Sequence, residues 1–373
     1  MSEVLYQGAK DVFLAKVRAD FDAIEDQALK STRAIQNYSL LGTDPLADAL
    51  FTEVSDTTDD GSRAVWRHVG VTGVKNLGTR QAGGTFSDVE FIRTYETAVY
   101  DPDNQPNGKF KVPYEREAKE ARMYKAILDR AKFLMLEIDR MNIQDPFEVF
   151  NLAFTVPTSY PTSGLGGGRF FARGNMGLDG NNTALGERLV STQHARADAG
   201  ATWSNALTTS GNAAVLEDDT YWQARITGSA LVDDRGKPYP AFGGRVTIVT
   251  TPSNIKVAKQ LQDSDWEIET AENQVNVHKG TFTKMITSPY LNASAYVSGV
   301  ANTSQWFLVD ESMRDTQVGT GLVCISFIPL QSNVFNDEEV NSAVYNIQQE
   351  KVYGFVEPRS ILGSNGTGAA YTD

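Results

Sequence analysis

The chain has 373 residues, of which 41% are hydrophobic and 22% are charged, and its formal net charge is −13. This composition is globular and the length allows one large core or two smaller ones, which excludes disordered and collagen-like classes. The acidic balance argues against a protein that grips nucleic acid, because phosphate binding needs clustered lysine and arginine. It remains compatible with weak enclosure of a polyanion, or with a charge that simply keeps an abundant protein soluble.

Targeting signals and disulfides are the next features to consider. The sequence begins MSEVLYQGAKD, without the basic and apolar segments of a secretory signal, and no run approaches the ~20 apolar residues of a membrane span. We therefore expect a protein that is made and kept in a cytoplasm. Cys324 is the single cysteine, so no intrachain disulfide can form, and its apolar surroundings LVCISFIPL predict a buried small hydrophobe.

The first predicted element is an amphipathic helix from residue 3 to about residue 35. Phe13, Val17 and Phe21 recur every four residues on one face, and acidic residues occupy the other face. We expect this apolar stripe to lie either on the chain's own core or on a neighbouring subunit.

A long β-hairpin is predicted between Phe51 and Tyr100. Its strands read AVWRHVGVTGV and VEFIRTYETAVY, and the segment between them is glycine-rich, with Gly78, Gly83 and Gly84 near the tip. Both faces of the ribbon mix apolar and polar residues. Because a lone two-stranded ribbon is marginally stable in water, we expect it to need a partner surface, such as another copy of the chain.

The strongest helical pattern follows Pro113 and covers residues 114–142, and Asp145-Pro146 is expected to stop it. At 1.5 Å per residue this helix is roughly 40 Å long, well above the average, so it should cross a whole domain. Its apolar seam includes Tyr124, Leu128, Met135 and Ile138.

The remaining chain changes character twice. Residues 161–211 are rich in glycine, serine and asparagine and predict an extended, loop-dominated passage. From about residue 215 an α/β pattern predicts a second domain, with helices at 216–232 and 251–262 and strands at 245–250, 281–287 and 306–310. The last fifty residues return to strand patterns, and GSNGTGAAYTD is expected to be a flexible tail.

Residue types for catalysis or zinc binding are present but poorly arranged. Ser191, His194 and Asp198 share one short stretch, yet triads are assembled by folds, and the chain has no G-x-S-x-G elbow. The three histidines, His68, His194 and His278, lack the spacing of zinc ligands. We expect each histidine to lie at the surface or to form hydrogen bonds, and we expect no catalytic activity, cofactor or metal.

Two further motifs have a simpler explanation than ligand binding. The run GLGGGRFFARGNMGLDG lacks the strand, the helix and the G-K-[ST] ending of a phosphate-binding loop, so we expect a flexible connection. The acidic cluster Glu217, Asp218 and Asp219 has the chemistry to hold a divalent ion, but acids at a helix start more often complement the helix dipole.

Three passages have sequence patterns that resemble those of a known family. GERLVSTQHARADAGATWSNALT is similar to the degenerate pattern DG..LFST.HP....SN.L, DDRGKPYPAFGGRVTIVTTPSNIKVAKQL to D..G.P....P..L.V.P.L...A..LL, and GFVEPRSILGSNG to YG..D.RG..GS.G. These patterns resemble the Mu-like major capsid (head) proteins of tailed bacteriophages, which share the Hong-Kong-97-like fold. The matching residues are Leu189, Ser191, Thr192, His194, Ser204, Asn205, Gly236, Pro238, Pro252, Ala258, Gly354, Pro358, Arg359, Gly363, Ser364 and Gly366. Ala195 stands where the family often has proline, and Ser360 where it often has glycine.

The resemblance implies an α+β fold whose parts follow the order of the predicted elements. These parts are an N-terminal arm (1–50), an E-loop hairpin (51–113), a first P-domain part with the spine helix (114–214), an α/β A-domain (215–321), and return strands with a tail (322–373).

The resemblance also implies a function. Pentamers and hexamers would form an icosahedral shell around packaged double-stranded DNA, assembled in the host cytoplasm and retained in the virion, with portal, scaffold and decoration proteins as partners. Hairpin tips and N-terminal arms would clasp neighbouring rings. Because the amphipathic helix begins almost at Met1, we expect any scaffold to be a separate protein. Two alternatives stay open: an encapsulin-like shell around a cargo enzyme, and an α/β hydrolase using residues 215–310.

Overall fold

The structure is a computed structural model, and it describes only part of the chain. The described residues are 15, 18–19, 50–55, 65–75, 90–99, 107–113, 121–155, 170–171, 187–196, 202–233, 236–239, 241–244, 246–266, 275–282, 284–292, 304–311, 321–337 and 342–370. The chain divides into two compact units. The first comprises residues 1–42, 102–145 and 326–351, and the second comprises residues 43–101, 146–325 and 352–373.

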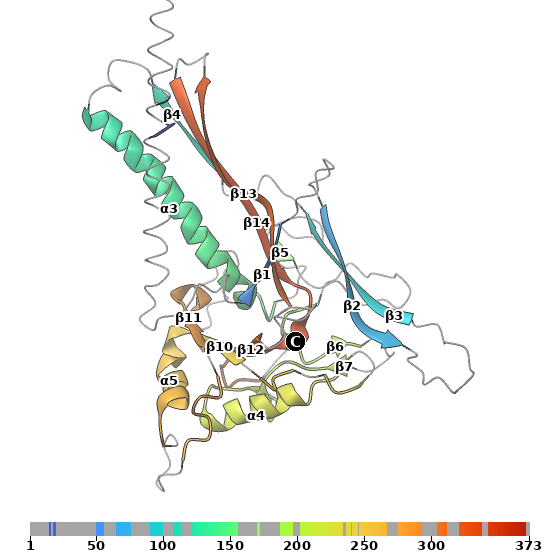
Figure 1. Cartoon of the computed structure of the whole chain (residues 1–373). Coiled ribbons are helices and arrows are strands. Elements are labelled where there is room, and N and C mark those ends of the chain that lie inside the picture. The colour runs from blue at the N-terminus through green and yellow to red at the C-terminus, as the bar shows by residue number, and fades with distance from the viewer. Residues whose placement is uncertain are drawn as a thin grey trace, which may run out of the picture. The chain divides into compact units, whose positions relative to one another are not determined.

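The first unit contains most of a long helix and of two long strands, whose remaining residues belong to the second unit. Helix α3 (Ala121–Asn151) and strands β13 (Leu322–Asp337) and β14 (Ser342–Phe355) are the longest described elements (Figure 1). Strand β4 (Asn107–Pro113) pairs antiparallel with β14.

The helix packs on β14 within this unit. Met135 and Ile138 are buried, and the Tyr345 hydroxyl donates a hydrogen bond to the Met135 sulfur at 3.8 Å. Asn142 donates to the Gln349 side chain at 2.8 Å. The side chains of Tyr124 and Leu128, the other two seam residues, lie outside the description.

The predicted end of this helix is wrong. Instead of stopping near Asp145, α3 continues through Pro146 to Asn151. A proline inside a helix costs about 3 kcal/mol because it loses one backbone hydrogen bond and crowds the preceding turn. Here residues 144–153 are all buried, and the Phe150 ring lies 5.0 Å from that of Phe307. Tertiary burial therefore outweighs the local preference, which is the only signal the sequence pattern carries.

The second unit is built on a four-stranded sheet with the order β11-β10-β12-β15. Its strands are β10 (Val246–Thr250), β11 (Lys284–Thr287), β12 (Trp306–Asp310) and β15 (Ile361–Ser364), and β10 pairs parallel with β11 and antiparallel with β12. Every residue of β10, β12 and β15 is buried. Such strands require cover on both faces, which explains their nearly continuous apolar sequences.

Two helices of this unit also agree with the predicted pattern. They are α4 (Asp218–Ser229) and α5 (Ile255–Asp263), the latter preceded by the short turn η3 (Pro252–Asn254). Helix α4 is anchored through Gly228, where a Cβ atom would lie 2.6 Å from the Phe242 ring. Phe242 has a left-handed φ of 58° and donates its backbone N–H to the buried Asp310 carboxylate at 2.5 Å. The helix is thereby held tightly to the sheet region.

The expected flexible tail is wrong for residues 363–370, the part of it that the structure describes. Strand β15 pairs with β12, and residues 361–364 are buried in the sheet of the α/β region. The Ser364 hydroxyl donates to the Ala214 carbonyl at 2.7 Å. Gly366 has a φ of 66°, and a Cβ there would lie 2.0 Å from the Ser304 carbonyl oxygen. Gly366 permits this close approach of two backbone segments, whereas the glycine-rich composition of the segment alone suggested a mobile end.

The predicted hairpin is present as strands β2 (Val65–Lys75) and β3 (Glu90–Val99), which pair antiparallel with an irregularity between Val71 and Gly73 (Figure 1). The ribbon covers less of the chain than the predicted segment 51–113. Strand β1 (Thr52–Ser55) is a neighbour of β13, and β4 pairs with β14, so both flanks of the 51–113 segment belong to another sheet. Gly78, Gly83 and Gly84 lie outside the described residues.

The described residues also include five short strands. They are β5 (Phe170–Phe171), β6 (His194–Ala195), β7 (Thr202–Trp203), β8 (Thr208–Thr209) and β9 (Asn212–Ala213). Phe13, Val17 and Phe21 lie outside the described residues, although the nearby Ala15, Arg18 and Ala19 are helical. Within the described part of the chain, no helix has the length and apolar character needed to cross a membrane.

Candidate functional site

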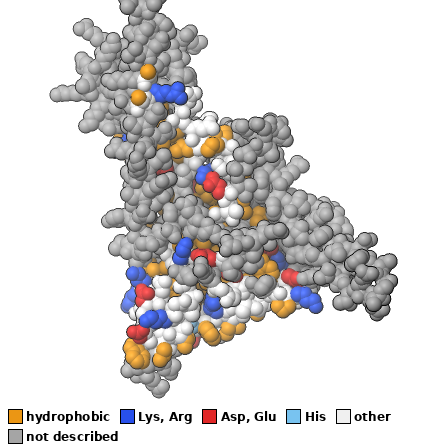
Figure 2. All heavy atoms as spheres, in the orientation of Figure 1, with side chains coloured by type: hydrophobic (Ala, Val, Ile, Leu, Met, Phe, Trp, Pro, Cys, Tyr) orange, Lys and Arg blue, Asp and Glu red, His pale blue; other side chains and the backbone are white. Residues whose placement is uncertain are grey.

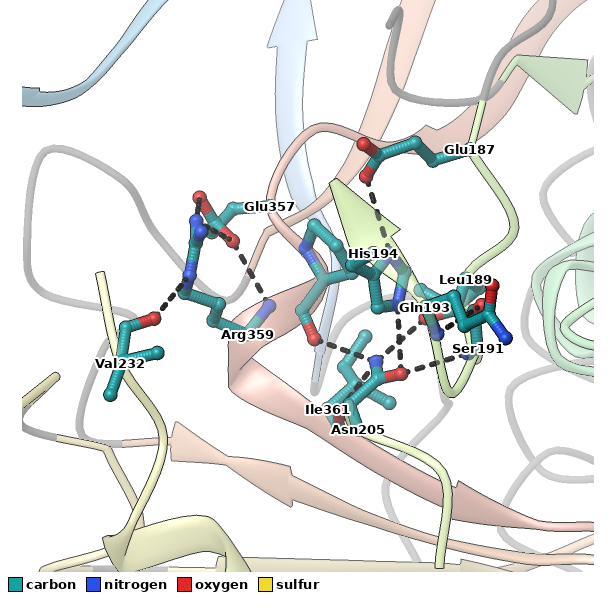
Figure 3. A network of polar contacts seen from close by, with 11 residues as sticks. Glu187, Leu189, Ser191, Gln193, His194, Asn205, Val232, Glu357, Arg359 and Ile361 are labelled. Carbon is teal, nitrogen blue, oxygen red and sulfur yellow. Dashed lines mark hydrogen bonds and ion pairs between the residues drawn. The ribbon is translucent and has the colours of Figure 1, made fainter. Parts of the chain in front are cut away.

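A buried asparagine connects distant parts of the second unit. Asn205 is fully buried, and its Oδ1 accepts the backbone N–H of Ser191 at 2.9 Å. Its Nδ2 faces three backbone carbonyl oxygens, of Leu189 at 2.8 Å, Pro358 at 3.1 Å and Ile361 at 3.0 Å (Figure 3). Asn205 and Pro358 are 153 positions apart in the sequence. One side chain thus joins the first matching passage to the third.

His194 extends this network. Its Nε2 lies 2.8 Å from Asn205 Oδ1, and its Nδ1 lies 3.2 Å from the Glu187 carboxylate. The imidazole stacks on the Trp203 ring with centroids 4.2 Å apart and an interplanar angle of 17°. His194 and Trp203 face each other across the β6–β7 pair, so the strand register places the two rings together. The histidine is buried and has both ring nitrogens engaged.

Arg359 brings a buried positive charge to the same place. Its Nη1 lies 3.2 Å from each Glu357 carboxylate oxygen, and its Nε donates to the Val232 carbonyl at 2.9 Å (Figure 3). The guanidinium carbon also lies 4.5 Å from the centre of the Trp203 ring. Both members of this ion pair are almost fully buried, and such a pair is tolerated only when its remaining hydrogen bonds are made.

The turn after Val232 presents that carbonyl to Arg359. Asp233 donates its backbone N–H to the Lys237 carbonyl at 2.7 Å, and its carboxylate accepts the Lys237 N–H at 2.8 Å. Gly236 has a φ of 74°, which suits glycine. We call the set Glu187, Ser191, His194, Trp203, Asn205, Val232, Glu357 and Arg359 the Asn205 network. The second matching passage begins at Asp233, so it adjoins the network at this turn and contributes none of the network's side chains.

The geometry offers no support for a hydrolytic triad at Ser191. The Ser191 hydroxyl accepts the Gln193 N–H at 3.0 Å, and the His194 nitrogens face Asn205 and Glu187 instead. Asp198 lies outside the described residues. The arrangement can hold backbone segments together, and its polar groups are directed at one another.

The acidic start of α4 is explained without an ion. Asp218 lies 3.1 Å from Nε2 of the buried His278, and the Glu217 N–H donates to the Thr220 hydroxyl at 2.9 Å. Across the described ranges, no three His, Cys, Asp or Glu side chains group as metal ligands. Burial raises the pKa of Tyr221, against the opposing effects of its 2.8 Å hydrogen bond to Thr281 and of the Arg225 charge.

Sequence reasoning missed an exposed apolar face on the same unit. It consists of Trp222 (49% exposed), Ile226 (46%), Trp266 (56%), Val275 (68%) and Val277 (61%). Trp222 lies beside the His278 ring with centroids 5.7 Å apart, and Trp266 forms a β-bridge with Val275, so these residues belong to neighbouring segments. Figure 2 shows hydrophobic side chains along the lower edge of the view, where Figure 1 places α4.

A signal for this face was present in the sequence. Tyr221, Ala224 and Gly228 form the buried stripe of α4, so Trp222 and Ile226 fall on the opposite side. A helix with apolar residues on two faces departs from the ordinary surface pattern.

No family model matches the sequence, and no curated protein sequence matches it. Capsid proteins of phages recur among the solved structures that the chain resembles. A structure from Mycobacterium phage Patience matches 95% of this chain and 90% of its own, with 11% identity and a TM-score of 0.47. The mature capsid of bacteriophage PhiM1 matches 84% of each chain at 11% identity and a TM-score of 0.45. A virus-like particle from Pyrococcus furiosus matches 93% of this chain and 98% of its own, at 10% identity and a TM-score of 0.38.

Proposed function

We propose that this chain is the major capsid protein of a tailed bacteriophage, a non-enzymatic subunit with the Hong-Kong-97-like fold. Pentamers and hexamers of it close into an icosahedral shell around packaged double-stranded DNA. The observation that carries the proposal is the meeting of the first and third matching passages in the Asn205 network, next to the point where the second passage begins. Unrelated chance matches would have no physical reason to meet in one buried site across 153 positions.

The chemistry of that network favours a structural role. Asn205, His194 and Arg359 direct their polar groups at buried backbone and at buried carboxylates. Buried networks of this kind rigidify one arrangement of the chain, because separating their paired members would be costly in a low-dielectric interior. A rigid unit is what a subunit needs when it repeats the same contacts around a closed shell.

The exposed apolar face supports contacts between copies. A buried aromatic side chain removes about 150–250 Å² from water, so two half-exposed tryptophans leave roughly 200 Å² of aromatic surface exposed. Tryptophan is enriched at the centres of protein interfaces. On α4 the exposed residues from Trp222 to Ser229 are uncharged, and the partly exposed Arg225 among them is positive. Copies of a chain with net charge −13 would therefore meet there with little repulsion between negative charges.

Other parts of the chain fit the same proposal. The β2–β3 ribbon has few means of stabilising itself alone, and contacts with adjacent rings would cover it. We assign the N-terminal arm an equivalent clasping role. Portal, scaffold and decoration proteins would be further partners, and the DNA would be enclosed without sequence-specific binding.

Negative-stain electron microscopy of the purified full chain, with a nuclease-protection assay on native particles, tests the proposal. We expect closed shells, and protected DNA in particles from infected cells. Shells that lack DNA and hold a co-purified enzyme would favour the encapsulin-like alternative. A protein that stays monomeric at high concentration and turns over esters would refute the shell and favour the hydrolase.

A further inference from the structure

The hydrogen bonds around Asn205 fix which way its amide points. Nδ2 faces the carbonyl oxygens of Leu189, Pro358 and Ile361, which accept only. Oδ1 faces the Ser191 N–H, which donates only. A flipped amide would place its oxygen against three carbonyl oxygens and its NH₂ group against an N–H. Backbone groups of fixed chemistry therefore set the orientation, and an acceptor oxygen is directed at His194.

The position of one proton on His194 follows. Asn205 Oδ1 can only accept, so Nε2, at 2.8 Å, must carry a proton and donate it. In a neutral imidazole the other nitrogen, Nδ1, would then present a lone pair. That nitrogen lies 3.2 Å from the Glu187 carboxylate, whose oxygens also present lone pairs.

Two facing lone pairs in a buried site repel, and a single proton removes the conflict. We infer that the Glu187–His194 pair holds one proton more at neutral pH than a free glutamate and a free neutral histidine hold, and that this proton locks the Asn205 network. The proton lies between His194 Nδ1 and Glu187 Oε2, whether it is written on the imidazole or on the carboxyl. This inference concerns the folded subunit and does not depend on what the subunit assembles into.

The surroundings of the ring are compatible with the extra proton. The His194 side chain is fully buried and that of Glu187 is 9% exposed, so water cannot readily separate them. Stacking on Trp203 favours a positively charged ring through the negative face of the indole. The charged groups near this stack include Arg359, which also contacts Trp203, and Glu357, which pairs with Arg359. Arg188, next to Glu187, and Arg196, two residues after His194, add positive charge close by in the sequence.

The second buried histidine provides a contrast. His278 Nε2 lies 3.1 Å from Asp218, and within the described part of the chain its Nδ1 has no hydrogen-bond partner. A neutral His278 with its proton on Nε2 can therefore donate to Asp218 Oδ2 without a further proton. Of these two histidines, His194 alone is placed between an obligate acceptor and a carboxylate, so the extra proton is required there and is not required at His278.

The extra proton makes folding depend on pH. A free histidine loses its proton near pH ~6.5, so above that pH the folded pair binds one proton more than the unfolded chain. Stability is then fully present below about pH 6.5 and is lost as the pH rises through the range in which the folded pair deprotonates. One proton corresponds to a roughly tenfold rise in the unfolding equilibrium constant per pH unit.

Urea unfolding of the full chain between pH 7 and pH 9 tests the inference in the wild type, Glu187→Gln and His194→Gln. Burial raises the pKa of Tyr221, which keeps that phenol neutral in this window. The side-chain amide introduced by Glu187→Gln can donate to a neutral Nδ1, so this variant no longer needs the extra proton. Its unfolding equilibrium constant should therefore rise about tenfold less per pH unit than that of the wild type. His278→Gln, at the other buried histidine, should keep it. Equal pH dependence in wild type and Glu187→Gln would overturn the inference.

If Glu187→Gln does not fold, His194→Gln answers the same question, because it also removes the titrating pair. Retention of the wild-type dependence in that variant would overturn the inference. A wild-type chain whose unfolding constant does not rise between pH 7 and pH 9 would overturn it without any variant.

Discussion

The Asn205 network and the exposed apolar face lie in the same unit and use their side chains in opposite ways. The network buries polar and charged groups and pairs most of them internally, whereas the face leaves two tryptophans about half exposed. Buried polar groups are costly unless paired, and exposed aromatic groups are costly unless covered. The first arrangement therefore fixes the subunit, and the second calls for a partner outside it. Substitutions in the two regions should separate folding from assembly.

The largest effect on folding is expected from Asn205→Ala. This change leaves the Ser191 N–H, the carbonyls of Leu189 and Pro358, and His194 Nε2 without their partner in a dry interior. Removing the partner of several buried groups costs about 3–5 kcal/mol, so the second unit should unfold or melt far below the wild type. Circular dichroism melting measures this. Asn212→Ala, at an exposed asparagine, is the matched control and should change stability little; equal melting of both variants would contradict the structure.

Gly366→Ala should have the next largest effect. Its Cβ would lie 2.0 Å from the Ser304 carbonyl oxygen, and its φ is 66°. Gly368 has a similar φ of 65°, but a Cβ there meets only a Val215 methyl at 3.5 Å. Gly368→Ala should therefore cost about 1 kcal/mol from the backbone conformation, and Gly366→Ala about 2–4 kcal/mol because the clash is added. Chemical unfolding of the pair isolates the contribution of close approach.

The sequence predicted some elements of the second unit well and others poorly. Helix α4 and strands β10 and β12 follow from local apolar patterns, because burial on one side or on both leaves a periodic signature. The end of α3 and the role of Gly366 depend on what packs against them, and a composition rich in glycine resembles a tail. No local pattern reveals Pro146 inside a buried helix or a carbonyl 2.0 Å from an absent Cβ.

The candidate site was only partly predictable for the same reason. Resemblance to family passages marked His194, Asn205 and Arg359, but not Glu187, Trp203 or Glu357, which complete their contacts. Ion pairing, stacking and hydrogen-bond orientation arise between segments that are far apart in the sequence. The possible triad of Ser191, His194 and Asp198 shows the converse. Ser191 and His194 are near in sequence, but their side chains bond to other groups.

Arg359→Lys should have an intermediate effect of about 2 kcal/mol. A lysine keeps the charge, but it cannot both face the two Glu357 oxygens and donate to the Val232 carbonyl, and it loses the flat contact with Trp203. Urea unfolding followed by tryptophan fluorescence measures the loss. Lys256→Arg, at an exposed lysine on α5, is the control for a basic exchange. A stability unchanged from the wild type would mean that the planar geometry of Arg359 is unimportant.

The smallest effect on folding, and a large effect on assembly, is expected from Trp222→Glu. Trp222 is 49% exposed on the side of α4 opposite its buried stripe, so its replacement should change subunit stability by no more than about 0.5–1 kcal/mol. If copies of the chain meet there, a new negative charge on an already acidic protein should prevent closed shells from forming.

Phe133→Glu, at a 71% exposed aromatic residue on α3, is the matched control and should leave assembly intact if the effect is specific to the α4 side. Melting by circular dichroism and sedimentation velocity on the same preparations decide between the outcomes. A folded Trp222→Glu that still forms normal shells would remove this face from the contact, whereas a wild type that forms no shells would refute the capsid proposal itself.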